Sequence, residues 1–309
     1  MIGLQHDIVP ITDPIGPAGT DPNYGCLIVS EETIKGGLYV NSVREQNGLN
    51  KLDIHAIDLV ADSDSGIPGQ EDEKMSSTGQ RHRLLGSLVR PVQRRQHPDG
   101  HPYVIGLTGG IASGKSAISK RLESFGASVI NCDLLGHQAY LPGKKAYSEV
   151  IETFGEQILE ESKEINRSAL SKIAFSDKEK LAKLSQIVWP EILVLIEEEI
   201  RNLACKATSV VVLEAAVLLE AGWESIVDEI WVSIIPEKEA LSRVLSRDGI
   251  SEQQAQNRIK SQMTNEERIV KANVVFSTLW DPKYTQKQVE KAWKGLQNRL
   301  PCTASDSKP

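Results

Sequence analysis

Short apolar runs recur along the chain from residue 103 onward, and each is followed by a polar stretch or a helical pattern. The runs occupy residues 103–107, 128–131, 209–213, 230–235 and 273–276. Apolar runs of this length, bounded by turn signals, are typical of fully buried strands, and helices separate them along the chain. The pattern therefore predicts an α/β fold with a five-stranded parallel sheet that is covered by helices on both faces.

The helical stretches carry signals of their own. Ile118, Leu122 and Phe125 recur at helical spacing, which predicts one buried stripe on the helix after the first strand. Pro190 falls inside a long helical pattern, and we expect it to kink or break that helix. Asp248-Gly249 predicts a helix end, and Ser251 with Gln254 predicts the capping box that starts the next helix.

The N-terminal part has a separate pattern. Within residues 26–60, the runs "CLIVS" and "LDIHAIDLV" flank a helix-like stretch, which predicts a β-α-β unit. Residues 61–74 are polar and acidic and read as a loop. Residues 88–101 hold two prolines among basic residues and predict an extended linker. The ending "PCTASDSKP" predicts a disordered tail.

Composition narrows the function classes. The chain of 309 residues is 40% hydrophobic and 25% charged, as in ordinary soluble proteins of one large or two modest domains. Its net charge of -7 argues against a broad nucleic-acid interface. We expect no transmembrane segment and no signal peptide, because no apolar run approaches the ~20 residues of a membrane helix. Four scattered cysteines without a C-x-x-C pair favour a reducing compartment and argue against a zinc site.

The segment "GGIASGKS" after the first strand matches the phosphate-loop pattern G-x-x-x-x-G-K-[ST]. Its glycines allow backbone N–H groups to approach phosphate oxygens, and the following helix adds its positive N-terminal end. Lys115 can reach the β- and γ-phosphates of a nucleotide, and the Ser116 hydroxyl can hold Mg²⁺. A plain glycine-rich turn is the alternative, and the flanking strand and helix disfavour it. The predicted nucleotide site consists of Gly109, Gly110, Ile111, Ala112, Ser113, Gly114, Lys115 and Ser116.

Asp133 follows the second strand, at the carboxyl end where α/β sheets place ligand groups. A carboxylate in that position can orient an attacking hydroxyl group and accept its proton. Asp is also a good helix N-cap, and the residues alone leave the two roles equally open.

A pair of capped helices over residues 237–269 presents several arginines. Arg243 and Arg247 are four residues apart and share a helix face, as do Arg258 and Gln262. Arginine suits phosphate because its planar fork donates paired hydrogen bonds. Together with the phosphate loop, this arrangement favours a nucleotide-kinase lid over a solvated charged surface.

Six segments resemble, in order, the dephospho-CoA kinase family over about residues 103–297. They are "IGLTGGIASGKS", "ASVINCDLLGH", "INRSALSKIAF", "VVLEAAVLLEAG", "LSRVLSRDGIS" and "SQMTNEE". "AAVLLEAGW" and the late "STLWDPKYTQKQVEKAW" look most like the kinase half of animal-type bifunctional coenzyme A synthases. "LIVSEETIKGGLYVNSVREQNGL" and "SSTGQRHRLLG" resemble the second half of phosphopantetheine adenylyltransferase.

The resemblance implies a P-loop nucleoside-monophosphate-kinase-like fold with a helical substrate domain and a lid. It implies ATP with Mg²⁺ as cofactors and dephospho-CoA as the substrate, phosphorylated on its ribose 3′-hydroxyl. Asp133 falls on the family's catalytic aspartate, and Arg247 falls on its lid arginine. The implied parts are an adenylyltransferase-like segment over 1–83, a linker over 84–102, a kinase domain over 103–297 and a tail over 298–309.

Three positions depart from the family pattern: Asn131 replaces a first aspartate, Trp189 a histidine, and Thr278 an asparagine near the adenine site. Two other functions stay open, a kinase of another small hydroxyl compound and a nucleotide-dependent switch without an acceptor. Both the cytosol and the mitochondrion fit the composition. We expect no adenylyltransferase activity, because the chain has no H-x-G-H histidine pair; the nearest string, "HPDGH", is one residue too long.

Overall fold

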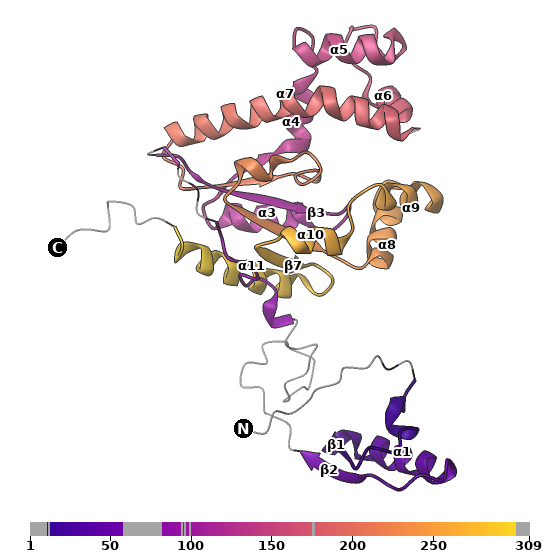
Figure 1. Cartoon of the computed structure of the whole chain (residues 1–309). Coiled ribbons are helices and arrows are strands. Elements are labelled where there is room, and N and C mark those ends of the chain that lie inside the picture. The colour runs from indigo at the N-terminus through magenta and orange to yellow at the C-terminus, as the bar shows by residue number, and fades with distance from the viewer. Residues whose placement is uncertain are drawn as a thin grey trace, which may run out of the picture. The chain divides into compact units, whose positions relative to one another are not determined.

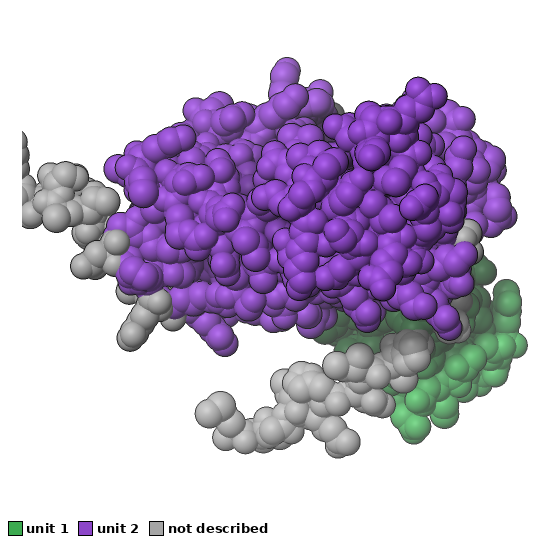
Figure 2. Space-filling model, turned by 90° about the horizontal axis from the view of Figure 1, so that it is seen from above, with its two compact units in different colours: residues 1–80 green, residues 81–309 purple. Residues whose placement is uncertain are grey.

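The computed structural model describes residues 11, 13–57, 82–93, 95, 97, 98, 100–174 and 177–300. The chain forms two compact units, residues 1–80 and residues 81–309, which Figure 2 draws in green and purple. The loop predicted over 61–74 and residues 301–309 of the tail predicted over 298–309 lie outside the described residues. In the described part of the chain, no helix has both the length and the apolar character needed to cross a membrane.

The smaller unit confirms the predicted β-α-β pattern. Strands β1 (Cys26–Ser30) and β2 (Asp53–Ile57) are parallel, and helix α1 (Ile34–Gln46) connects them. Short 3-10 turns stand at Gly16–Gly19 and Glu31–Thr33. Arg44 of α1 is fully buried and donates hydrogen bonds to the carbonyl oxygens of Ala18, Asp21 and Asn50. This buried arginine ties the segment before β1 to the turn before β2.

The larger unit contains the predicted five-stranded sheet, and all of its strands are parallel. The strands are β3 (Tyr103–Gly109), β4 (Ser128–Asn131), β5 (Val210–Glu214), β6 (Glu229–Ile234) and β7 (Val274–Ser277). Their order in the sheet is β4-β5-β3-β6-β7. The strand that precedes the phosphate loop is therefore central, and its neighbours can deliver side chains to the loop from both sides.

Helices connect the strands (Figure 1). They are α3 (Lys115–Ser124), α4 (Cys132–Ala139), α5 (Lys145–Phe154), α6 (Arg167–Ala174), α7 (Lys178–Cys205), α8 (Glu237–Asp248), α9 (Glu252–Lys260), α10 (Asn265–Lys271) and α11 (Pro282–Gln297). Short 3-10 turns occur at Glu156–Ile158 and Trp223–Ile226. The predicted helix end at Asp248 and the predicted capping box at Ser251 are confirmed.

The sheet has an apolar core on each face. On one face, α3 and α11 cover β3, β6 and β7, and the buried stripe of Ile118 and Leu122 belongs to this core. On the other face, α4 and α7 pack against β4 and β5. Helices α5 and α6 lie beyond α7 in Figure 1 and form a helical layer away from the sheet. The layering is the α/β arrangement that the apolar pattern predicts.

Helix α7 contradicts one of the two outcomes predicted for Pro190, a break in the helix. The helix runs through this proline to Cys205. Proline removes one hydrogen bond from a helix, and packing of Val188, Ile192 and Ile196 in the core offsets that loss.

Residues of the expected linker bind to the larger unit in the part that the structure describes. The Gly86 N–H donates to the carbonyl oxygen of Val275 in β7 at 2.9 Å, and the Val89 N–H donates to that of Asn273, just before β7, at 2.8 Å. His97 makes a hydrogen bond of 2.5 Å with Asp228, whose other carboxylate oxygen accepts from the Val104 N–H. The described residues of this stretch therefore belong to the larger unit.

A buried carboxylate fastens α11 to the sheet. Glu229 of β6 is fully buried and makes a two-pronged ion pair with Arg299, with distances of 2.8 and 2.9 Å. The Tyr103 hydroxyl and the Trp231 indole N–H also donate to it. Burial and the nearby Glu229 charge raise the pKa of Tyr103 well above its usual value, which keeps its hydroxyl proton available as a donor.

Arg299→Met should lower the free energy of unfolding by about 3 kcal/mol, because it leaves the Glu229 charge buried without its counter-ion. This loss is at the low end of the range for a broken buried ion pair, because the Tyr103 hydroxyl and the Trp231 indole N–H still donate to Glu229. All five tryptophans lie in the larger unit, so a urea titration followed by tryptophan fluorescence reports on that unit alone. Lys294→Met, at an exposed position of α11, is the control. Equal stability of both variants would contradict the prediction.

Candidate active site

The phosphate loop leaves the central strand β3 and enters α3, and its shape depends on two glycines. Gly109 has a φ of 155°, and a Cβ atom there would lie 2.3 Å from the Ser233 carbonyl oxygen. Gly114 has a φ of 85°, and its Cβ would lie 2.7 Å from the Thr278 side chain. Any larger residue at either position would push the loop away from β6 or from the chain after β7.

Neighbouring strands hold the carbonyl groups of the loop. The Ser113 carbonyl oxygen accepts from the Ser233 hydroxyl at 2.5 Å and from the Thr278 hydroxyl at 2.9 Å. Arg243 of α8 donates to the Ala112 carbonyl at 3.3 Å and to the Thr278 carbonyl at 2.7 Å. With its carbonyl groups held from behind, the loop can turn its N–H groups toward a ligand.

Lys115 begins α3, and its side chain folds back over the loop. Its ammonium group donates to the carbonyl oxygens of Gly109 and Gly110 at 2.8 and 3.1 Å. Burial lowers the pKa of Lys115 to about 8, and Asp133 and Glu214 offset part of that effect. The site therefore holds a cation whose charge is weakly stabilised until an anion arrives.

A buried carboxylate lies beside Ser116. Glu214, the last residue of β5, accepts from the hydroxyl groups of Ser116 and Ser119, both at 2.6 Å. Sequence reasoning did not include Glu214 in the site. A sequence signal for Glu214 does exist, because "VVVLE" is an apolar strand that ends in a carboxylate. That strand, β5, pairs with β3, which precedes the phosphate loop.

The structure rules out one of the two roles left open for Asp133, that of helix N-cap. The N-cap of α4 is Asn131, whose side chain accepts from the N–H groups of Asp133 and Leu134 at 3.0 and 3.2 Å. Asp133 is the second residue of the helix and faces the cavity. Loss of hydration and the nearby Glu214 raise the pKa of Asp133, while Lys115 lowers it. Asn131, one of the departures from the family pattern, thus caps the helix.

Arg247 lies at the end of α8, where it reaches the cavity from the lid. It makes a two-pronged ion pair with Asp248, at 2.6 and 3.1 Å, and Arg258 of α9 contacts the same carboxylate at 3.3 Å. The hydrogen bond that Arg247 donates to Asp248 raises the pKa of Arg247. The Arg247 side chain is 59% exposed, so it is accessible to a ligand phosphate that replaces Asp248.

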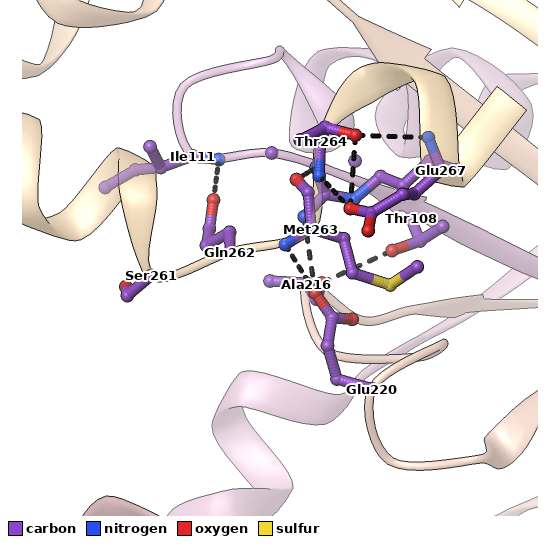
Figure 3. A network of polar contacts seen from close by, with 12 residues as sticks. Thr108, Ile111, Ala216, Glu220, Ser261, Gln262, Met263, Thr264 and Glu267 are labelled. Atoms are coloured by element: carbon purple, nitrogen blue, oxygen red, sulfur yellow. Dashed lines mark hydrogen bonds and ion pairs between the residues drawn. The ribbon is translucent and has the colours of Figure 1, made fainter. Parts of the chain in front are cut away.

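Gln262 links the lid segment to the phosphate loop. Its side-chain oxygen accepts from the Ile111 N–H at 2.7 Å, although the two residues are 151 positions apart (Figure 3). The next residues are fixed to the core, because the Met263 N–H donates to Glu220, and Arg268 donates to the Met263 carbonyl. This contact between lid and loop was not predicted.

These groups surround one cavity of about 790 Å³. The structure brings Asp133, Lys115, Ser116 and Arg247 together in its wall, with Ile111, Ala112, Ser113 and Gly114. Gly109 and Gly110 lie behind the wall and contribute carbonyl groups to Lys115. The further lining residues are Ala117, Glu214, Ala216, Ser242, Arg243, Ser246 and Gln262.

The other two positions that depart from the family pattern, Trp189 and Thr278, do not line the cavity. Trp189 of α7 is partly buried against the core on the α4–α7 face. Thr278 uses its hydroxyl to brace the loop and accepts from Arg243 at 2.9 Å, so its side chain is committed to loop geometry.

Comparisons with known proteins agree with this geometry. The dephospho-CoA kinase family model matches residues 103–278. Dephospho-CoA kinases from Carboxydothermus hydrogenoformans and Geobacter sulfurreducens are 42% and 39% identical to this chain. The alignments cover 60% and 62% of this chain and 90% and 96% of those proteins. A crystal structure of a Thermus thermophilus protein, 31% identical, aligns with a TM-score of 0.55 over 65% of this chain and all of that chain.

The Lys115 pKa predicts how nucleotide affinity depends on pH. A bound polyphosphate favours the charged ammonium, so ATP raises the pKa of Lys115 above about 8. Below that pH the lysine is already charged, so the affinity for ATP should not change with pH. Above it, binding must take up a proton, and the dissociation constant should rise by up to ~10-fold per pH unit. Calorimetry with a non-hydrolysable ATP analogue between pH 7 and 9.5 measures this.

Lys115→Arg is the matched control, because a guanidinium group stays charged over this range. Its affinity should not vary with pH, whatever its absolute value. A flat profile for the parent protein would mean that Lys115 does not titrate in the empty site.

Proposed function

This chain belongs to the dephospho-CoA kinase family, and we propose that its cavity transfers the γ-phosphate of ATP to the 3′-hydroxyl of dephospho-CoA. The observation that carries the proposal is the position of Asp133, which lines the same cavity as the phosphate loop. Its carboxylate has no hydrogen-bond partner among the described residues of the cavity wall. It is therefore available to an incoming hydroxyl group.

The residues beside the loop fit a magnesium ion. Ser116, Glu214 and Asp133 supply oxygen donors in one cavity, and Mg²⁺ prefers one or two carboxylates together with phosphate and water oxygens. Among the described residues no three His, Cys, Asp or Glu side chains form a ready metal cage. An ion that enters with the nucleotide suits this arrangement. Ser116 would hold it directly, with Glu214 orienting the hydroxyl, and its charge would neutralise phosphate oxygens.

The remaining roles follow from charge and position. Lys115 and Arg247 both line the cavity and offset the negative charge on the phosphoryl group as it moves. Asp133 orients the acceptor hydroxyl and takes its proton. Arg243 positions the loop through Ala112 and Thr278. Closure of α8 and α9 excludes water, which would otherwise compete as the acceptor.

The test of the acceptor is ADP release from ATP, measured with dephospho-CoA, adenosine, AMP or pantetheine. We expect dephospho-CoA alone to stimulate release strongly, with one phosphate added per molecule. Stimulation by another of these hydroxyl compounds would favour a kinase of that compound. Slow release that no acceptor stimulates would indicate a nucleotide-dependent switch.

We further propose that residues 1–83 derive from a phosphopantetheine adenylyltransferase, as in animal-type bifunctional coenzyme A synthases. The parallel pair β1 and β2 joined by α1 agrees with the second half of such a domain. In that segment His55 is exposed on β2, and the sequence supplies no H-x-G-H pair. The scattered cysteines favour a reducing compartment, the cytosol or the mitochondrion.

This chain should therefore form no pyrophosphate above a buffer control from 4′-phosphopantetheine, ATP and magnesium. The same preparation must phosphorylate dephospho-CoA, which shows that the protein is folded and binds ATP. Pyrophosphate that depends on 4′-phosphopantetheine would contradict the prediction. Persistence of that signal in Lys115→Ala would place the activity outside the phosphate loop.

Asp133→Asn should lower kcat by roughly 10²–10⁴, the range for a lost general base, with little change in ATP affinity. The amide keeps the size of the side chain and cannot accept the proton. Stability should be unchanged, because Asn131 caps α4. Asp281→Asn is the matched control, since Asp281 caps α11 and Asn is an equally good cap. Near-parent turnover of Asp133→Asn would remove Asp133 from the chemistry.

A further inference from the structure

The contact between Gln262 and Ile111 joins the phosphate loop to the segment that follows the lid helix α9. Ile111 belongs to the phosphate loop, and its N–H group is one of those that the loop can offer to a ligand. Gln262 follows α9, the second helix of the lid. Its neutral side-chain oxygen accepts from Ile111 at 2.7 Å, and both residues line the cavity.

The chain after Gln262 is fixed to the body of the larger unit. Met263 donates from its N–H to Glu220 at 3.4 Å and accepts from Arg268 at 2.5 Å (Figure 3). Arg268 is only 1% exposed and also pairs with Glu220 at 3.3 Å. Thr264 and Glu267 form the capping box of α10, which fixes the direction in which that helix starts.

The chain before Gln262 is held far less firmly. In α9, Ala255 is the one residue that is buried, and the helix packs mainly against α8. Gln262 therefore stands at the boundary between an exposed lid helix and a buried anchor. Its side chain stays with the anchor, so its hold on Ile111 does not depend on where α9 lies.

Amide chemistry suits this position. A carboxylate at residue 262 would accept the same hydrogen bond but would repel nucleotide phosphates at the cavity wall. A lysine would offer no acceptor. Arg268 already supplies positive charge near the loop, since its charge contributes to lowering the pKa of Lys115. A neutral acceptor orients the Ile111 N–H without adding charge of either sign.

We propose that Gln262 is a positioning residue that holds the phosphate loop in its nucleotide-binding shape before ATP arrives. The proposal rests on the proposed function in one respect, that the ligand of the loop is ATP. Pre-organisation of this kind strengthens binding because the loop does not have to be ordered when the ligand enters. Pre-organisation of the loop by Gln262 therefore affects the affinity for ATP and has little effect on the rate of phosphoryl transfer.

Two variants abolish the hydrogen bond between Gln262 and Ile111 in different ways. Gln262→Met keeps the length of the side chain and removes the acceptor. Gln262→Asn keeps the amide but, one methylene shorter, cannot reach Ile111. We expect both to bind a non-hydrolysable ATP analogue about 3- to 10-fold more weakly, the value of one hydrogen bond. KM for ATP should rise by the same factor, and kcat at saturating ATP should stay within about 2-fold.

Gln253→Met is the control, because Gln253 is exposed on α9 and contacts Asn257 of the same helix. Its nucleotide affinity should equal that of the parent, and all variants should share the parent's melting temperature. Analogue binding is measured without an acceptor, so failure of dephospho-CoA to stimulate ADP release would bear on the proposed function alone. Parent-like affinity in Gln262→Met would overturn the proposal. Tighter binding would overturn it too, because Gln262 would then compete with phosphate for the Ile111 N–H.

Discussion

The Ser113 carbonyl oxygen, held by hydroxyl groups from two other segments, is the contact on which the site depends. A phosphate loop binds anions only while its N–H groups face inward, and that requires its carbonyl groups to be satisfied on the outer side. Ser233 at the end of β6 and Thr278 after β7 supply those donors to Ser113. Gly109 and Gly114 allow the approach, since a Cβ atom at either would collide with these same segments.

The sheet, the phosphate loop and several helix ends could be predicted from the sequence, because their signals are local. Buried strands of a parallel sheet read as apolar runs, and the phosphate loop is one continuous motif between the first strand and its helix. The cap and the end of a helix are likewise local, as at Ser251 and Asp248. The sequence left open whether Asp133 caps α4, and the coordinates show that Asn131 is the cap. The side chain that reaches the first N–H groups depends on where the helix begins.

The contacts that escaped prediction join residues far apart in the chain. Gln262 meets Ile111 across 151 positions, and Arg243 reaches Ala112 across 131. Their pairing follows from the strand order, which places β6 beside the strand that leads into the loop and β7 beside β6. The basic, proline-containing stretch near residue 90 looks solvated in sequence. It packs because the sheet edge at β7 has N–H and C=O groups that need partners, and Val89 supplies one.

The two carboxylates of the cavity differ in a way that assigns them different tasks. Glu214 is buried, and both of its oxygens accept from hydroxyl groups that the loop helix holds in place, so it is a fixed part of the wall. Asp133 has its pKa raised by loss of hydration and by Glu214, and Lys115 offsets this only in part. A carboxylate with a raised pKa is the better proton acceptor, provided that it is still ionised at the working pH. The Lys115 ammonium favours that ionised form, because its charge lowers the pKa of Asp133. The same ammonium donates to the carbonyl oxygens of Gly109 and Gly110, so one cation acts both on the phosphate loop and on the proton acceptor that we propose.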